Sequence, residues 1–346
     1  MNFASSPRRV TALALAALLV PGSIGAAEAQ GEVNIYSYRE PGLIDPLLKA
    51  FTAKTGIKTN VVFAAAGLNE RLAAEGAASP ADLLFTVDAG RLSEAKDAGL
   101  TQPVKSAALD AIPALYRDAD SHWFGLTMRA RVIYASKERV KQDAITYEDL
   151  ADPKWKGKVC TRPGQHVYNT SLIATMIAHR GEAATEAWLK GVRANLGRKP
   201  AGGDREAVRD VHLGQCDLAL ANTYYMAAML KNPEQKAWAE SVRIIFPNAA
   251  DRGSHINISG MALTRHTKNK ANALKLMEFL ASDEGQSLYS RANNEYPISP
   301  KVAPSDLVKS WGTLKPDQLA LANIAKYRKR ASELVDQVAF DTGPTN

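Results

Sequence analysis

The stretch Val33-Asn-Ile-Tyr-Ser-Tyr38 has the apolar pattern of a buried strand, and a helical pattern follows it over Leu43–Thr55. Gly56 marks the end of this helix, because glycine readily adopts the backbone conformation that ends many helices. The alternation continues with strands predicted at Thr59–Phe63 and Leu83–Val87 and helices at Leu68–Glu75 and from Asp88 to Ala98. Strands that alternate with helices favour a parallel sheet with helices on its faces.

A second group of strand and helix patterns occupies residues 158–246. Strands are predicted at Lys158–Cys160, Asp217–Ala221 and Val242–Phe246, and helices at Ser171–Ala178, Glu182–Asn195 and Arg205–Leu213. The extended apolar segments Arg131–Tyr134 and Ile258–Leu263 flank this group, and we interpret them as two crossovers between lobes. The remainder is largely helical, with helices predicted at Ala271–Leu280, Glu284–Ala292 and Asp317–Val338.

These patterns predict an α/β protein of two lobes, with two crossover hinge segments and a cleft between the lobes. We expect the first lobe to comprise residues 30–130 plus 262–346, including the C-terminal helices, and the second lobe residues 131–261. In open α/β sheets, ligands bind beyond the carboxyl ends of the strands. The residues that directly follow each strand are therefore the first candidates for a binding site.

Residues 1–29 have the features of an export signal. Arg8 and Arg9 precede the apolar run Val10–Val20, which is too short for a lasting membrane anchor, and Ala27-Glu-Ala29 matches a cleavage site. We expect cleavage after Ala29, a periplasmic location and no membrane span in the mature chain. A buried N-terminal helix is the alternative, and the sequence leaves open whether the general or the twin-arginine pathway exports the protein.

The composition suits a folded protein of about two domains. The chain has 346 residues, of which 46% are hydrophobic and 23% charged, and such a composition excludes disorder. Its net charge of +7 is spread along the chain, so nucleic acid is not an expected partner. Because exported proteins meet an oxidising compartment, we predict a disulfide between Cys160 and Cys216. The alternative is two separate buried thiols.

Motifs typical of enzymes are absent from the sequence. It contains no G-x-S-x-G, no H-E-x-x-H and no G-x-x-x-x-G-K-[ST] motif, and the spacing of its six histidines does not suit a zinc site. We therefore expect a protein that is not an enzyme.

Tyrosines follow several of the predicted strands. Tyr224 and Tyr225 come soon after one strand, Tyr168 begins a helix after a short loop, and Tyr38 ends the first strand. Phenolates are hard oxygen donors, and three of them neutralise the three charges of ferric iron. A phenol must lose its proton to bind a metal, so affinity should fall as pH falls. The alternative for each tyrosine is simple packing in the core.

At these residues the chain resembles the ferric-iron-binding periplasmic proteins of bacterial iron ABC transporters, over nearly its whole mature length. The element Asn222-Thr-Tyr-Tyr225 with the upstream Tyr168 is the most specific part of the resemblance. The other matching segments are Tyr36–Arg39, Phe51–Gly56, Ser79–Asp88, Trp123–Tyr134, Leu150–Gly157 and His255–Leu263.

The resemblance implies a periplasmic-binding-protein fold and three phenolate ligands, which are Tyr168, Tyr224 and Tyr225. It also implies an arginine close behind the ligands in the segment Met128–Arg131, and we favour Arg129 over Arg131. Glu40 and Pro41 stand where some relatives have a His-Tyr pair, and Phe63 and Ala64 where others have an acidic ligand. The first lobe therefore offers either Tyr38 as a fourth phenolate or an anion such as carbonate held by Arg39.

The leading interpretation is a periplasmic receptor that closes its lobes on Fe(III) and delivers it to an inner-membrane ABC permease. We expect a monomer. The alternative is a two-lobed binding protein for a small organic or inorganic anion held by Arg39 and Arg129. Whether ferrous iron binds, the affinity, and whether iron arrives free or chelated are not determined by the sequence.

Overall fold

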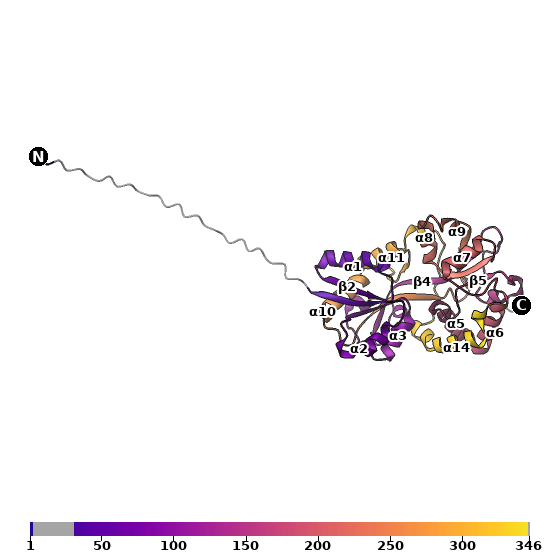
Figure 1. The fold of residues 1–346 in the computed structure, drawn as a ribbon, viewed down its shortest axis with the longest axis horizontal. Coiled ribbons are helices and arrows are strands. Elements are labelled where there is room, and N and C mark those ends of the chain that lie inside the picture. The colour runs from indigo at the N-terminus through magenta and orange to yellow at the C-terminus, as the bar shows by residue number, and fades with distance from the viewer. Residues whose placement is uncertain (3–30, 345–346) are drawn as a thin grey trace.

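The computed structural model describes residues 1–2 and 31–344. Apart from its first two residues, the predicted signal peptide, with its cleavage after Ala29, lies outside the described residues. Within the described part, none of the helices has both the length and the apolar character needed to cross a bilayer. The described chain folds into two lobes side by side, which the long strand β4 (Trp123–Ser136) connects (Figure 1).

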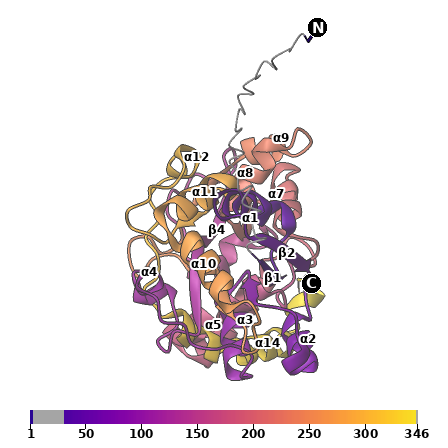
Figure 2. The same ribbon diagram turned by 90° about the vertical axis from the view of Figure 1, so that its left-hand side faces the viewer.

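The first lobe contains the predicted parallel strands. β1 (Glu32–Ser37) lies between β2 (Lys58–Phe63) and β3 (Leu83–Thr86), parallel to both. The helices α1 (Pro41–Thr55), α2 (Leu68–Glu75) and α3 (Ala89–Asp97) connect and follow these strands. Viewed from the end of this lobe, α1 lies on one side of the strands and α2 and α3 on the other (Figure 2).

Two residues determine helix ends in this lobe, and the first, Gly56, is where the sequence predicted one. Gly56 ends α1 with φ = 73°, in the left-handed region that glycine adopts without strain. Asp88 caps α3, because its carboxylate accepts a hydrogen bond of 3.0 Å from the backbone N–H of Arg91. Gly56 therefore fixes where α1 gives way to β2, and Asp88 fixes where β3 gives way to α3.

β4 belongs to both sheets. Its first half, through Ala130, pairs with β8 (Ile256–Leu263), and its second half, from Arg131, pairs with the strands of the second lobe. The first crossing therefore lies at the predicted place. β8 pairs along its length with β3 and the first half of β4, so the second crossing precedes Ile256 rather than lying within Ile258–Leu263.

The second lobe is built on β6 (Leu218–Asn222), which lies between β4 and β5 (Val159–Thr161). β7 (Val242–Ile245) also pairs with β4. The helices of this region are α5 (Val167–Arg180), α6 (Glu182–Ala194), α7 (Asp204–His212), α8 (Tyr224–Lys231) and α9 (Lys236–Glu240). The predicted disulfide between Cys160 and Cys216 is present and ties β5 to the turn before β6.

The C-terminal part of the chain returns to both lobes. α10 (Lys270–Ala281), α11 (Asp283–Asn293) and the short β9 (Tyr296–Pro297) lie with the first lobe, where β9 pairs with β4. The short helices α4 (Ala107–Asp110) and α12 (Asp306–Lys309) are the smallest α-helices of the described chain.

The predicted helix Asp317–Val338 is instead two helices, α13 (Leu321–Lys326) and α14 (Arg328–Gln337), which meet at Tyr327. α13 packs against both α3 and α5, and α14 packs against α5. The C-terminal segment is thus a third connection between the lobes, which the sequence patterns did not predict. The lobe boundaries 30–130 plus 262–346 and 131–261 stay a prediction.

Candidate metal centre

A cleft with a volume of about 310 Å³ lies between the lobes, and residues of both lobes line it. All four predicted tyrosines line this one cavity: Tyr38, Tyr168, Tyr224 and Tyr225. They are far apart in the sequence, but each comes soon after a strand. Tyr38 directly follows β1, Tyr168 follows the loop after β5, and Tyr224 and Tyr225 come shortly after β6. The fold therefore brings together the candidate ligands that the strand ends indicated.

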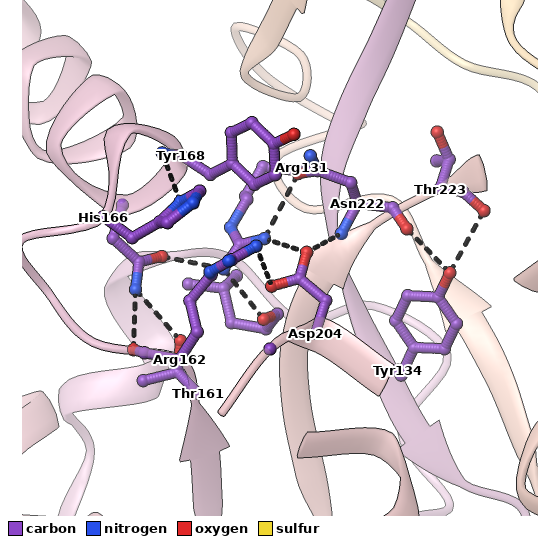
Figure 3. Close-up of polar contacts among 12 residues, drawn as sticks. Arg131, Tyr134, Thr161, Arg162, His166, Tyr168, Asp204, Asn222 and Thr223 are labelled. Carbon is purple, nitrogen blue, oxygen red and sulfur yellow. Dashed lines mark hydrogen bonds and ion pairs between the residues drawn. The ribbon is translucent and has the colours of Figure 1, made fainter. Parts of the chain in front are cut away.

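Tyr168 lies in the first turn of α5. His166 caps this helix, because its Nδ1 accepts a hydrogen bond of 3.2 Å from the backbone N–H of Tyr168 (Figure 3). Burial, together with the nearby Arg162, lowers the pKa of His166 to about 3, so the imidazole is neutral at physiological pH. Its ring packs edge-on to that of Tyr168, with 4.6 Å between the centroids, and this contact orients the phenol toward the cleft.

Tyr224 and Tyr225 begin α8, directly after β6 and Thr223. The hydroxyl of Tyr224 donates a hydrogen bond of 3.0 Å to the hydroxyl of Tyr168. The rings of Tyr224 and Tyr225 are also in contact, with 4.4 Å between the centroids. Three phenol side chains from two helix starts therefore meet at one point of the second lobe.

The two tyrosines of α8 are protonated in the metal-free protein. Loss of hydration around the hydroxyl, reinforced by Tyr168 and Tyr225, raises the pKa of Tyr224 well above 10. Loss of hydration, together with the carboxylate of Asp204, raises the pKa of Tyr225 to about 12. A cation with enough charge to displace both protons is required before these phenols can act as phenolates.

Arg129 is a buried cation without a partner. Its side chain is 1% exposed, and among the described residues none accepts a hydrogen bond from its three guanidinium nitrogens. The guanidinium carbon lies 5.6 Å from the centre of the Tyr168 ring. A small cavity of about 10 Å³ adjoins Arg129, Tyr168 and His255. An unpaired buried charge is costly, so the arrangement favours a negative charge in or beside this position.

Arg131, two residues further along β4, has the opposite character. It forms an ion pair of 2.6 Å with the buried Asp204 and donates to Asn169 at 2.8 Å and to the carbonyl of Leu220 at 3.0 Å. Figure 3 shows Asp204 between Arg131 and Arg162, close to the strand end at Asn222. Arg131 therefore uses its charge in contacts that stabilise the second lobe. The guanidinium of Arg129 has no such contact among the described residues and could interact with a negative charge at the site.

Arg39 approaches from the first lobe. It forms a buried ion pair of 2.6 Å with Glu295 and donates a hydrogen bond of 3.0 Å to Ser259. Its guanidinium carbon lies 5.8 Å from the centre of the Tyr224 ring. Arg39 thus places positive charge beside a candidate phenolate, while Glu295 occupies part of its hydrogen-bonding capacity.

Tyr38 lines the cleft on the first-lobe side, where its hydroxyl accepts a hydrogen bond of 2.8 Å from the backbone N–H of Asn69. The guanidinium carbon of Arg91 lies 4.2 Å from the centre of its ring. Burial raises the pKa of Tyr38, and the contacts with Asn69 and Arg91 oppose this rise. Both contacts favour the negatively charged form of Tyr38.

The sequence reasoning gave no role to Arg162, although it lies in the loop between β5 and α5. Its guanidinium carbon is 5.0 Å from the centre of the Tyr168 ring, and its buried Nε has no partner among the described residues. The only signal was its place directly after a strand. Its approach to Tyr168 depends on Asp204, which lies 3.4 Å from one of its nitrogens and comes from a distant helix.

No other obvious metal-binding group competes with the tyrosines. The described residues contain no cluster of three or more His, Cys, Asp or Glu side chains that could hold a metal ion. An all-oxygen site of phenols with arginines behind it suits a hard cation of high charge. The side chains of the cleft are therefore candidates for a site that binds a hard cation such as ferric iron, and the nearby arginines also suit an anion.

Comparison with known proteins agrees with this chemistry. Residues 78–313 match the family described as bacterial extracellular solute-binding protein. "Iron uptake protein A1" of Synechocystis is 42% identical over 316 residues, which cover 90% of this chain and 88% of that protein.

Two solved structures are also similar over most of the chain. The ferric iron-binding protein A of Mannheimia haemolytica, in an open conformation, is 50% identical with a TM-score of 0.85, covering 90% of this chain and 99% of that one. A Trichodesmium protein in complex with iron and citrate ligands is 41% identical, also with a TM-score of 0.85, covering 90% of this chain and 100% of that one.

Proposed function

Because this chain belongs to the bacterial extracellular solute-binding proteins, we propose that it is a periplasmic receptor that binds ferric iron through tyrosine phenolates and delivers it to an ABC permease. Membership of a solute-binding family makes the chain a binding protein rather than an enzyme. Similarity to iron uptake and ferric iron-binding proteins identifies iron as the solute. The observation that carries the ligand assignment is the meeting of Tyr168, Tyr224 and Tyr225 at one wall of the cleft.

The three phenolates would neutralise Fe(III) but leave part of its coordination sphere open. Two donors are available for the open side: Tyr38 from the first lobe, or an anion. Arg129 supports an anion, since its guanidinium is buried, unpaired and close to Tyr168. Carbonate is one such anion. A polycarboxylate such as citrate is another, because the cleft has a volume of about 310 Å³ and both Arg39 and Arg162 line it.

Delivery requires that the lobes close on iron and open at the membrane. The crossings at Ala130–Arg131 and just before Ile256 are the natural hinge, because the chain passes between the sheets there. We further propose that the mature protein begins after Ala29, acts in the periplasm as a monomer, and presents both lobes to an inner-membrane permease.

Titration of the metal-free protein with ferric citrate tests the function. An orange to red charge-transfer band should develop and saturate at one iron per chain, because phenolate-to-iron charge transfer requires tyrosine coordination. Citrate alone, without iron, is the control. Binding of citrate without any colour from ferric citrate would favour the alternative function, an anion receptor that uses Arg39 and Arg129.

The affinity for iron should fall steeply between about pH 8 and pH 5. The raised pKa values of Tyr224 and Tyr225 lie above this range, so each phenol releases a proton when iron binds. Protons compete with iron for each phenolate. For each proton that is released on binding, the affinity for iron therefore falls about ten-fold when the pH falls by one unit. Competition against a chelator, corrected for the protonation of the chelator itself, measures the slope. A flat profile would contradict phenolate ligation.

The variant Tyr38→Phe distinguishes the two ways of completing the site. If Tyr38 supplies a fourth phenolate, as we expect, the charge-transfer band should shift in this variant. Tyr36→Phe is the matched control, because Tyr36 lies on β1 two residues before Tyr38, and its hydroxyl donates to Glu75 instead of lining the cleft. An unchanged band in Tyr38→Phe would point to an anion at Arg39.

A further inference from the structure

A short loop carries two of the groups at the iron site. It runs from Arg162, whose guanidinium lies 5.0 Å from the Tyr168 ring, to His166, which caps the helix that carries Tyr168. The intervening residues Pro163, Gly164 and Gln165 belong to no strand or helix. The positions of both groups therefore depend on what holds the middle of this loop.

Asp341, near the C-terminus, holds that middle. Its carboxylate accepts hydrogen bonds from two successive backbone N–H groups, at 2.5 Å from Gly164 and 3.1 Å from Gln165. It lies in the 3₁₀ turn η5 (Phe340–Thr342), 177 residues from Gly164 in the sequence. Hydrogen bonds to a charged acceptor are stronger than neutral ones, so this carboxylate is a firm anchor.

The rest of the loop middle is bound to the same C-terminal segment. The side chain of Gln165 donates to the carbonyl of Ser332 at 3.0 Å and accepts from the hydroxyl of Ser332 at 2.6 Å. Gly164 packs so closely that an added Cβ would lie 2.8 Å from the ring of Phe340 and 2.9 Å from Val335. Only glycine allows this approach, and a larger residue would push the loop away from η5.

The C-terminal segment is itself anchored at both ends. Arg193 on α6 donates to the carbonyls of Val338 and Gly343, at 3.0 Å and 2.9 Å, which fixes η5 to the second lobe. At the other end, Arg328 forms ion pairs with Asp88 at 3.4 Å and Glu94 at 2.8 Å on the first lobe. The segment that holds the Tyr168 loop therefore also contacts the first lobe.

We infer that Asp341 is a positioning residue for iron binding: it fixes the loop 162–166 so that Tyr168 and Arg162 face the cleft in a ligand-ready geometry. Asp341 does not line the cleft and acts only through the backbone of Gly164 and Gln165. The inference rests on the proposed role of Tyr168 as an iron ligand.

The variant Asp341→Asn tests this, because an amide presents one acceptor oxygen where the carboxylate presents two. We expect iron to transfer to excess EDTA about ten-fold faster than in the wild type, since loss of a charge-assisted hydrogen bond is worth about one such factor. The charge-transfer band should also shift, because the phenolate of Tyr168 changes its geometry. A role confined to stability would leave the band of the loaded, folded protein unchanged.

Gly164→Ala provides the second variant. It should displace the same loop by a change in the loop itself, because the added methyl group would collide with Phe340 and Val335 of the C-terminal segment. It should reproduce the band shift and the faster transfer even if Asp341→Asn folds poorly. Glu333→Gln is the matched control: it removes a negative charge from the same segment but contacts Arg330 and not the loop. Its band and transfer rate should equal those of the wild type.

Two results would overturn the inference. Wild-type bands and rates in both Asp341→Asn and Gly164→Ala would show that the loop needs no anchor, and equal changes in Glu333→Gln would show that only charge matters. The variant Tyr168→Phe separates this from the proposed function. If it leaves the band unchanged, Tyr168 is not a ligand and the proposed site fails; if it alters the band while the loop variants do not, only the inference on Asp341 fails.

Discussion

The variant Tyr224→Phe should lose most of the ferric-phenolate colour and bind iron at least about a hundred-fold more weakly, because removing even the partners of metal ligands costs ten- to a hundred-fold. Tyr224 is the central phenol of the three: its hydroxyl bonds to that of Tyr168, and its ring contacts that of Tyr225. Phenylalanine keeps the ring and removes only the oxygen. Absorption spectra and chelator competition measure both effects.

Tyr116→Phe is the control for this variant. Tyr116 is a buried tyrosine of the first lobe that does not line the cleft, so its loss should leave colour and affinity unchanged. Circular dichroism should show that both variants fold. Wild-type affinity in Tyr224→Phe would contradict the tyrosine site, whatever the colour.

The second large effect concerns two arginines on one strand. Arg129→Met should raise the free energy of unfolding of the metal-free protein by about 2 kcal/mol, because it removes a buried charge that has no partner. The same variant should bind iron about ten- to a hundred-fold more weakly, since the positive charge behind Tyr168 is lost. Stability and affinity are thus expected to change in opposite directions.

Arg131→Met is the matched comparison, at an equally buried position two residues away. It leaves the buried Asp204 with the backbone N–H of Asn222 and, as its only cation, the more distant Arg162, so it should lower the free energy of unfolding by about 3–5 kcal/mol. Denaturant unfolding of both metal-free variants, followed by chelator competition on the folded samples, measures the contrast. Destabilisation by both variants to a similar extent would show that Arg129 is paired in solution.

Much of the fold follows from local patterns. The strands β1, β2 and β3 and their helices lie within a few residues of their predicted bounds, because apolar periodicity, Gly56 and Asp88 act over short distances. The single helix predicted over Asp317–Val338 was wrong, since its apolar residues serve two different surfaces. α13 packs on α3 and α5, whereas α14, which begins after Tyr327, packs mainly on α5 and on the turn η5.

The residues of the candidate site were likewise predictable from the sequence only in part. Tyr38, Tyr168, Tyr224 and Tyr225 were identifiable because each follows a strand, and the carboxyl ends of strands meet at the cleft. The different states of Arg129 and Arg131 were not identifiable. Both alternate on one strand, and only the position of Asp204, which is brought in by α7, leaves one arginine paired and the other free.

The amino-acid sequence by itself therefore indicated the α/β class and the tyrosines at the strand ends, because these depend on residues that are close together in the sequence. It also predicted the export signal, and it predicted the disulfide from the oxidising compartment to which such a signal directs a protein. Three-dimensional packing alone determines which charges are paired, that the second crossing precedes Ile256, and that Asp341 contacts Gly164 from 177 residues further along the chain. Such contacts join residues far apart in the sequence, and their formation depends on the packing of every element between them.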